Sequence, residues 1–417
     1  MKILVVSQYY WPESFRITEL VSSLRNKGCE VTVLTGQPNY PDGQIFAGYS
    51  AAGIGKQVHA DGYEIFRVPL IPRGNARSIR LALNYLSFVL SGSVFGPWLL
   101  RGRDFDVIFV FGTSPILQAI PAIVLKPMKR AKLVLWVQDL WPQSLEVTGH
   151  VKNKTVLQLV SGLVRWIYGR CDLLLGQSHA FIDALRPMAG NVPVKYHPNP
   201  ADLSFADKTD LPPPYRLQPG FNIVIAGNMG SAQAPETLVE AARLLGKESD
   251  IRIVLFGSGS RWDWVRSEAE RLGLDNIEFA GRFPPESMPS LLAQASAGMV
   301  LLGKGEILTQ TIPSKIPTYM AAGLPIIGSI DGEGARVIAE SGAGMATPAE
   351  DAVALADAMR QMRLLPDGKR DAMGRAGATY CAANFAPDRL ATNLIGHFNA
   401  LLGNDMQAPP RGKTVNE

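Results

Sequence analysis

The chain has 417 residues, of which 47% are hydrophobic and 19% charged; this excludes a disordered chain and is enough for two or three domains that each bury a core. Its three cysteines lie far apart in the sequence, which excludes a disulfide framework and a cysteine-based zinc site and suits a reducing compartment. The net charge of +4 is unevenly divided, because residues 1–200 hold 21 Lys and Arg against 12 Asp and Glu, while the remainder holds 20 against 25, an asymmetry that favours an anionic partner.

The first half alternates between strand and helix patterns. The apolar run 3–6 is too short for the core of a secretory signal, so we expect a buried parallel strand there. A helical pattern then ends at Gly28, and a second strand follows at 30–35. Such a strand–helix–strand unit belongs to a right-handed, doubly wound sheet. Further strands are predicted at 107–111, 132–137, 173–176 and 194–197, and helices from 116, at 154–168 and at 180–186.

The alternation stops in a segment rich in proline and charge and then restarts. Strands are predicted at 221–226, 251–256, 277–280, 298–302 and 326–329, and helices at 236–245, 262–272, 288–295 and 314–322. The sequence therefore predicts an α/β protein with two doubly wound domains. We expect a first domain over 1–203, a linker over 204–220, a second domain over 221–386, a helix over 387–403 that joins the first domain, and a disordered tail over 404–417.

Two glycine-rich turns follow strands of the second domain, where ligands of doubly wound sheets bind. The first turn holds Gly227, Asn228 and Gly230, and the second begins at Gly257. Neither turn is a dinucleotide-binding or P-loop motif. Each alone is also explained by a tight turn, whereas the pair favours a nucleotide.

A predicted helix start at Ser314 and Lys315 is more informative. Serine is a common N-cap residue, so we expect Ser314 to cap this helix. A lysine in the first turn is unfavourable beside the positive end of a helix unless an anion is bound there. Lys315 is therefore either a solvated side chain or a ligand of a diphosphate group.

Several motifs, in order over about residues 1–400, resemble those of the GT-B-fold retaining glycosyltransferases of family 4. Within that family the chain is most similar to the branch of WbuB-type N-acetyl-L-fucosamine transferases. The resemblance is carried by segments 2–13, 28–37, 138–142 (Gln-Asp-Leu-Trp-Pro), 198–200, 226–230, 313–315 and 319–325.

The resemblance implies two Rossmann-like domains that face each other across a cleft. A UDP-sugar would bind the second domain and an acceptor the first, with no cofactor and no metal. The chain departs from the family where two glutamates are usual, because Gln310 and Thr318 stand there. The family's diphosphate-binding arginine and lysine fall near Asn228 and Gln233, and its first-domain histidine near Gln138.

With those cations missing, diphosphate binding is expected to rely on Lys315, on backbone donors, and on Lys304 or Arg282. Stabilising a departing diphosphate is the main chemical need of this reaction, so cations and N–H groups should dominate the site. We expect further donor contacts in the loop that precedes Lys315. These candidates are Glu306, for sugar hydroxyls or only as a solvated charge, and Gln310, Thr311 and Ser314.

Two carboxylates beside strand ends of the first domain, Glu13 and Asp139, are candidates for contacting acceptor hydroxyls. A helix cap or a structural hydrogen bond explains either residue equally well.

Residues 81–100 carry no charge and are flanked by arginines on both sides. Their length permits a membrane span, although polar residues and Pro97 dilute the segment. The alternatives are a buried or interdomain helix and an amphipathic element on the membrane surface.

The resemblance implies a transferase that moves a sugar, N-acetyl-L-fucosamine or a related one, onto a polyprenyl-diphosphate-linked saccharide in O-antigen, capsule or exopolysaccharide synthesis. We expect it in the cytoplasm, attached peripherally to lipids at the inner face of the cytoplasmic membrane, and we expect no nucleic-acid partner. Two alternatives stay open: a GT-B sugar-nucleotide epimerase of the UDP-N-acetylglucosamine 2-epimerase kind, and a non-catalytic nucleotide-sugar-binding partner of a membrane complex.

Overall fold

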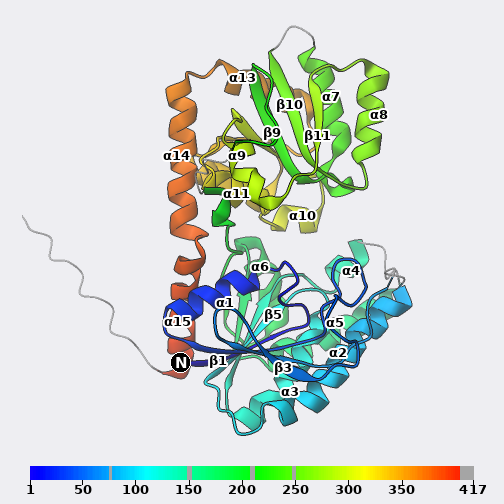
Figure 1. The fold of residues 1–417 in the computed structure, drawn as a ribbon, viewed down its shortest axis with the longest axis vertical. Helices are drawn as coiled ribbons and strands as arrows, with labels where there is room; N and C mark the ends of the chain where they lie inside the picture. Colours follow the sequence, from blue (N-terminus) through cyan, green and yellow to red (C-terminus); the bar gives the residue numbers. More distant parts are fainter. Residues whose placement is uncertain (75–77, 148–152, 207–211, 247–249, 404–417) are drawn as a thin grey trace, which may run out of the picture. The chain divides into compact units, whose positions relative to one another are not determined.

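The computed structural model describes residues 1–74, 78–147, 153–206, 212–246 and 250–403 (Figure 1). The expected tail over 404–417 and part of the expected linker lie outside these residues. Two compact units make up the chain. The first holds Met1–Gly176, Ala184–His197 and the chain from Leu390, and the second holds Gln177–Asp183 and Pro198–Arg389.

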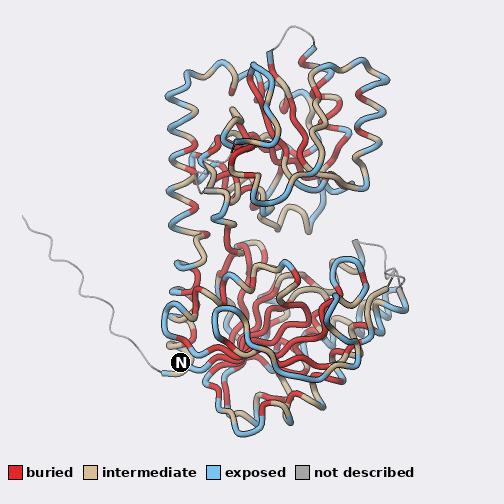
Figure 2. The backbone as a smooth tube through the Cα atoms, in the orientation of Figure 1, coloured by how far each residue is buried: buried red, intermediate tan, exposed pale blue. Residues whose placement is uncertain are grey.

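The first unit is built on an eight-stranded sheet in the order β3-β4-β2-β1-β5-β6-β7-β8. Its strands pair in parallel, except that β3 pairs antiparallel with β4. The central strands are buried along almost their whole length, as parallel strands covered on both faces must be (Figure 2). The strands are β1 (Lys2–Ser7), β2 (Glu30–Thr35), β3 (Gly55–Val58), β4 (Glu64–Arg67), β5 (Val107–Gly112), β6 (Lys132–Val137), β7 (Leu173–Gly176) and β8 (Val194–Tyr196).

Helices cover this sheet. Apolar residues of α1 and α15 pack on one set of alternating strand residues in a single buried cluster, whereas α2 packs against α3 and against the short helix η1. The helices are α1 (Ile17–Asn26), α2 (Ser78–Leu99), η1 (Ile116–Ala119), α3 (Ile120–Lys129), α4 (Gln143–Val147), α5 (Lys154–Gly169), α6 (His179–Ala189) and α15 (Pro387–Leu402).

The second unit has a six-stranded parallel sheet in the order β11-β10-β9-β12-β13-β14. The strands are β9 (Phe221–Asn228), β10 (Ile251–Ser258), β11 (Ile277–Gly281), β12 (Ala297–Leu301), β13 (Ile326–Ser329) and β14 (Gly344–Thr347). The helices are η2 (Leu203–Ala206), η3 (Ser231–Gln233), α7 (Pro235–Leu245), α8 (Trp262–Leu272), η4 (Pro285–Ser287), α9 (Met288–Leu292), α10 (Glu306–Gln310), α11 (Lys315–Ala321), α12 (Gly332–Ser341), α13 (Ala352–Leu364) and α14 (Asp367–Asn384).

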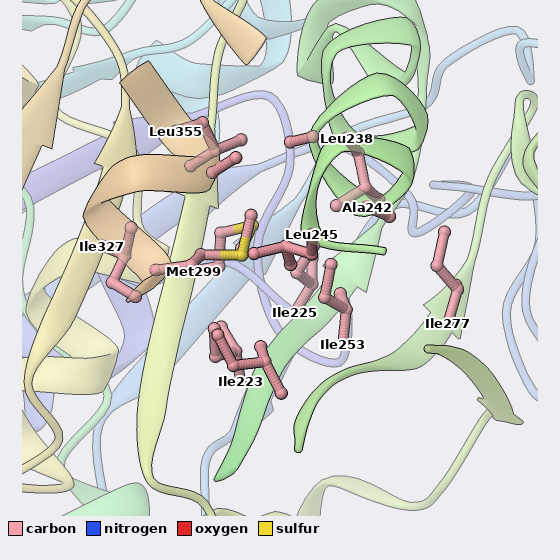
Figure 3. Packing of buried hydrophobic residues seen from close by; sticks show 14 of the residues in the cluster. Ile223, Ile225, Leu238, Ala242, Leu245, Ile253, Ile277, Met299, Ile327 and Leu355 are labelled. Carbon is pink, nitrogen blue, oxygen red and sulfur yellow. The ribbon is translucent and has the colours of Figure 1, made fainter. Parts of the chain in front are cut away.

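Two buried clusters, one on each face of this sheet, form the core of the second unit. On one face, Ile223 and Ile225 pack with Leu238 of α7 and Leu355 of α13 (Figure 3). The intervening Val224 belongs to the other cluster. Because successive strand residues point to opposite faces, this division confirms the predicted doubly wound sheet.

Helix α2 departs from the expectation of a buried core helix. It is long and apolar enough to cross a membrane, yet only 22% of its apolar stretch is buried in the protein. Its large exposed side chains recur every three or four residues, so they form one stripe along the helix. The stripe consists of Ile79, Leu83, Leu86, Leu90, Val94 and Trp98.

Candidate functional site

In doubly wound sheets, ligands bind at the carboxyl ends of the strands where the strand order reverses. In the second sheet this point lies between β9 and β12, because β10 and β11 continue to one side and β13 and β14 to the other. Gly227 is the second-last residue of β9, and the loop after β12 begins at Leu302 and contains Lys304. The loop is tied to the β9 side by a hydrogen bond from the Gly303 amide to the Ala232 carbonyl, at 2.8 Å.

Helix α11 brings Lys315 to this point. Tyr319, one turn later, is fully buried, and its hydroxyl accepts a hydrogen bond from the Ala226 amide at 2.8 Å. Its ring fits because Gly298 of β12 has no side chain there. As a result Lys315 lies against Gly227, where an added Cβ would be 3.5 Å from Cε and 3.7 Å from Nζ.

The charge of Lys315 is uncompensated. Within the described residues its ammonium has no hydrogen-bond or ion-pair partner, and burial lowers the pKa of the side chain. A half-buried cation without a partner is costly, and a bound anion would remove that cost. The structure thus joins Gly227 and Lys315, which the sequence predicted separately.

The glycine at position 257 has a structural explanation. Gly257 has a φ of 136°, and an added Cβ would lie only 2.0 Å from the Gly227 carbonyl oxygen. Gly259 meets the carbonyl of Met229 in the same way, at 2.1 Å. These residues are glycine because the two turns pack on each other, so Gly257 is not needed as a ligand contact to explain its identity.

The first turn offers neutral polar groups. The amide of Gly230 donates to Oε1 of Gln233 at 2.8 Å, and Nδ2 of Asn228 donates to the same oxygen at 3.4 Å. Asn228 is exposed. The two positions where the resemblance places cations therefore hold a small amide network instead.

The other predicted donor residues lie on α10 and in the segment between α10 and α11, and the predicted cap is wrong. Ser314 has helical backbone angles and its side chain makes no capping hydrogen bond. The hydroxyl of Thr311 donates to the Ile307 carbonyl, so its proton is already used. Oε1 of Gln310 is buried and has no partner among the described residues, whereas Glu306 is exposed at the start of α10.

The two remaining cations lie in different places. Lys304 is exposed in the loop after β12, and its amide donates to Oε1 of Glu350 at 2.8 Å. Arg282 follows β11, the edge strand, so β10 separates it from the end of β9. The arrangement favours Lys304 over Arg282 as a second cation beside Lys315.

In the first unit, the corresponding reversal lies between β1 and β5 and is occupied by polar side chains. The amide of Gln8 donates to Oε1 of Gln118 at 2.9 Å, and Gln118 in turn donates to Thr113 after β5. Nε2 of Gln8 donates to Oδ1 of Asn84 at 2.7 Å. Gln8 is 1% exposed, and its buried Oε1 has no hydrogen-bond partner within the described part of the chain.

Glu13 is not available to an acceptor hydroxyl, contrary to one of the two roles considered. It is 3% exposed, and its two carboxylate oxygens accept hydrogen bonds from the amides of Tyr10, Asn39 and Tyr40. Burial raises its pKa, while these three hydrogen bonds act in the opposite direction. Glu13 holds the loops after β1 and β2 together, which is the structural alternative.

Asp139 remains a candidate. It is half-buried after β6, and its Oδ2 accepts a hydrogen bond from the Trp141 indole at 3.1 Å. Burial raises the pKa of Tyr85. The charge of Arg73 lowers this pKa, and the charge of Asp139 raises it. This edge thus holds a carboxylate and a guanidinium that both lie within electrostatic range of Tyr85.

The sequence analysis missed Gln8, Asn84 and Arg73. Asn84 is one of the polar residues that dilute the apolar segment 81–100. It is fully buried, and its side chain also bonds Tyr9 and Ile71. A lone asparagine in an otherwise apolar helix was the available signal, because a buried amide must find partners.

Family models match both parts of the chain. A model described as "Glycosyl transferase 4-like domain" matches residues 14–201, and one described as "Glycosyl transferases group 1" matches residues 220–363.

Two relatives carry names of the same kind. WcaI of Escherichia coli, named as a colanic acid biosynthesis glycosyl transferase, is 26% identical over 344 residues, covering 78% of this chain and 82% of that protein. WbjE of Pseudomonas aeruginosa, named as a glycosyltransferase, is 28% identical over 312 residues, covering 70% and 74%.

Solved structures share the fold over the whole chain. A sucrose-phosphate synthase from Thermosynechococcus elongatus has a TM-score of 0.70 at 17% identity, covering 97% of this chain and 99% of its own. HepE from Anabaena, solved in complex with UDP, has a TM-score of 0.64 at 14% identity, covering 96% and 100%.

Proposed function

This chain carries both domains of a GT-B glycosyltransferase, and we propose that it transfers a sugar from a UDP-sugar to a polyprenyl-diphosphate-linked saccharide with retention of anomeric configuration. Its relative WcaI, named for colanic acid synthesis, supports a role in surface polysaccharide assembly. N-acetyl-L-fucosamine or a related sugar is proposed from the WbuB-type resemblance, and O-antigen, capsule and exopolysaccharide are the candidate products.

The observation that carries the donor site is the unpaired ammonium of Lys315 against Gly227. HepE, which shares the fold, binds UDP. A diphosphate at the β9 and β12 ends would supply the anion that Lys315 lacks. Because negative charge develops on the departing diphosphate, a cation held there stabilises the transition state more than the ground state.

The other donor and acceptor contacts are assigned from the position of each residue and the chemistry of its side chain. Lys304 is the second cation, and Gln310 and Glu306 are the donor-sugar contacts, because they lie on α10, the helix that precedes Lys315. In the first unit, the half-buried Asp139 is the acceptor contact. No metal takes part in this proposal, so transfer should persist in excess EDTA.

We propose that the enzyme works at the inner face of the cytoplasmic membrane. The exposed stripe of α2 supports this, since an apolar helix face of this length can lie in a bilayer interface. Arg101, whose guanidinium lies 5.7 Å from the Trp98 ring, stands at the end of that stripe, where it can meet anionic headgroups.

The test is a transfer assay with purified protein, a panel of UDP-sugars and a synthetic polyprenyl-diphosphate-linked sugar. Lys315→Met should lower the transfer rate by about 100-fold, as the loss of one transition-state donor typically does. Lys369→Met, which removes an exposed lysine on α14, is the matched control and should keep full activity.

NMR of the product and of the donor alone separates the alternatives. A retained anomeric configuration is expected. A donor converted without acceptor would indicate an epimerase, and no transfer by the isolated protein would indicate a binding partner. Near-normal turnover by Lys315→Met would remove the role given to Lys315.

A further inference from the structure

An apolar groove runs beside α2 in the first unit, outside the contacts described so far. It has a volume of about 520 Å³ and is almost entirely apolar. Ala52, Leu70 and Pro72 form one wall, and Leu90, Val94 and Phe95 of α2 form the other. A groove that is open to solvent and lined in this way suits a flexible hydrocarbon chain.

One end of the groove lies next to the buried polar pair of Gln8 and Asn84. Ile71 and Ser87 both line the groove, and the Ile71 amide donates to Oγ of Ser87 at 2.9 Å. The Ile71 carbonyl accepts from Nδ2 of Asn84 at 2.6 Å, and Asn84 accepts from Gln8. The lining of the groove is therefore hydrogen-bonded to the buried Gln8–Asn84 pair.

Positive charge lies at the same end. The guanidinium carbon of Arg73 is 5.6 Å from the Tyr9 ring centre and 5.0 Å from that of Tyr40. In the part of the chain that the structure describes, Arg73 makes no ion pair. A Cβ added at Gly74, the residue after Arg73, would lie 2.7 Å from Nη1 of Arg80, so a second guanidinium lies against the backbone next to Arg73. Arginine forks bind phosphate well.

We propose that this groove binds the isoprenoid chain of the acceptor lipid, with Arg73 holding its diphosphate. An apolar groove that ends at a cationic and polar cluster matches a prenyl diphosphate, whose long chain carries an anionic head. This inference rests on the proposed function for the identity of the lipid as the acceptor.

Farnesyl diphosphate is a suitable probe, with inorganic diphosphate and farnesol as its separate halves. Titration calorimetry should show farnesyl diphosphate binding at least tenfold tighter than either half. Ala52→Trp, which fills the groove from an exposed position, should weaken farnesyl diphosphate binding at least tenfold. Ala60→Trp, at another exposed alanine, is the matched control and should bind like the wild type.

A second variant tests the head group. Arg73→Gln should weaken farnesyl diphosphate and leave farnesol binding unchanged, whereas Arg130→Gln, at an exposed arginine, should change neither. Equal affinities for farnesyl diphosphate and inorganic diphosphate would overturn the inference. So would an Ala52→Trp protein that keeps farnesyl diphosphate binding and loses binding to lipid vesicles, since bilayer chains would then occupy the groove. UDP affinity, measured on the same proteins, reports on the proposed function separately.

Discussion

Glycines of the second unit differ in what fixes their identity, although many share a positive φ. A Cβ added at Gly257 would lie 2.0 Å from the Gly227 carbonyl oxygen. A Cβ added at Gly281, which has a φ of 86°, would have no atom within 4 Å. Backbone strain is common to both residues, but only Gly257 adds a clash with a neighbouring backbone.

Gly257→Ala should therefore lower the free energy of unfolding by about 2–4 kcal/mol, through strain and forced movement of the β9 turn. Gly281→Ala should cost about 1 kcal/mol, through strain alone. Urea unfolding of the two variants measures the difference. Equal losses would show that the packing of the two turns does not depend on Gly257.

Single site residues could be predicted from the sequence where the side chain is unfavourable in its own helix or strand. Lys315 stood out because a cation sits poorly in a first helical turn. Glu13 looked equally functional, but a sequence does not reveal that three amides from two loops surround it. Gln8 and Asn84 are 76 positions apart, and only the sheet topology brings them together.

Among the elements, α2 is the one whose surroundings the sequence could not reveal. Apolar residues occur on all its faces, so periodicity does not separate the side that contacts α3 from the exposed side. The strands were predicted well because buried parallel strands read as short, continuous apolar runs. The β3–β4 hairpin was missed because β3 is mostly exposed.

The stripe of α2 should bind anionic vesicles. The double variant Ile79→Glu, Leu86→Glu places two charges on the stripe away from the groove and should lower the vesicle-bound fraction at least tenfold, since each residue contributes about 1.5–3 kcal/mol when buried in lipid. Val353→Glu, Leu364→Glu on α13 changes two equally exposed apolar residues and is the control. Cosedimentation measures both, and equal losses would refute a specific role for α2.

At the scale of the whole molecule, the stability of the fold should depend on pH through a buried histidine. His197 is 1% exposed, packs on Trp136, and has no hydrogen-bond partner for either ring nitrogen within the described residues. Burial lowers its pKa to about 3, with a smaller contribution from His397. The unfolded chain, with a pKa of about 6.5, binds a proton that the folded protein does not.

Stability should consequently fall as the pH drops from about 6.5 toward 3. Between pH 7 and pH 5 this single group should remove about 2 kcal/mol of unfolding free energy. His197→Phe should lose less over the same interval, because the unfolded variant has no such proton to gain. Urea unfolding at the two pH values tests this, and parallel losses in both proteins would contradict the assignment.

The uneven charge of the chain follows its division into two units. The basic half corresponds largely to the unit that carries α2, the groove and Arg73, where anionic lipid is proposed to bind. The acidic half corresponds largely to the second unit, for which we propose an anionic nucleotide held with few cations. That is why one partly buried lysine carries so much of the proposed mechanism.

The most direct test of that mechanism is the affinity for UDP, measured by titration calorimetry for the wild type, Lys315→Met and the Lys369→Met control, with folding checked by thermal unfolding. Wild type and control should bind UDP alike, and Lys315→Met should bind it at least tenfold more weakly, because a charge-assisted contact to the diphosphate is lost. Equal UDP affinity in all three proteins, or no UDP binding by the wild type, would contradict a donor site at Lys315.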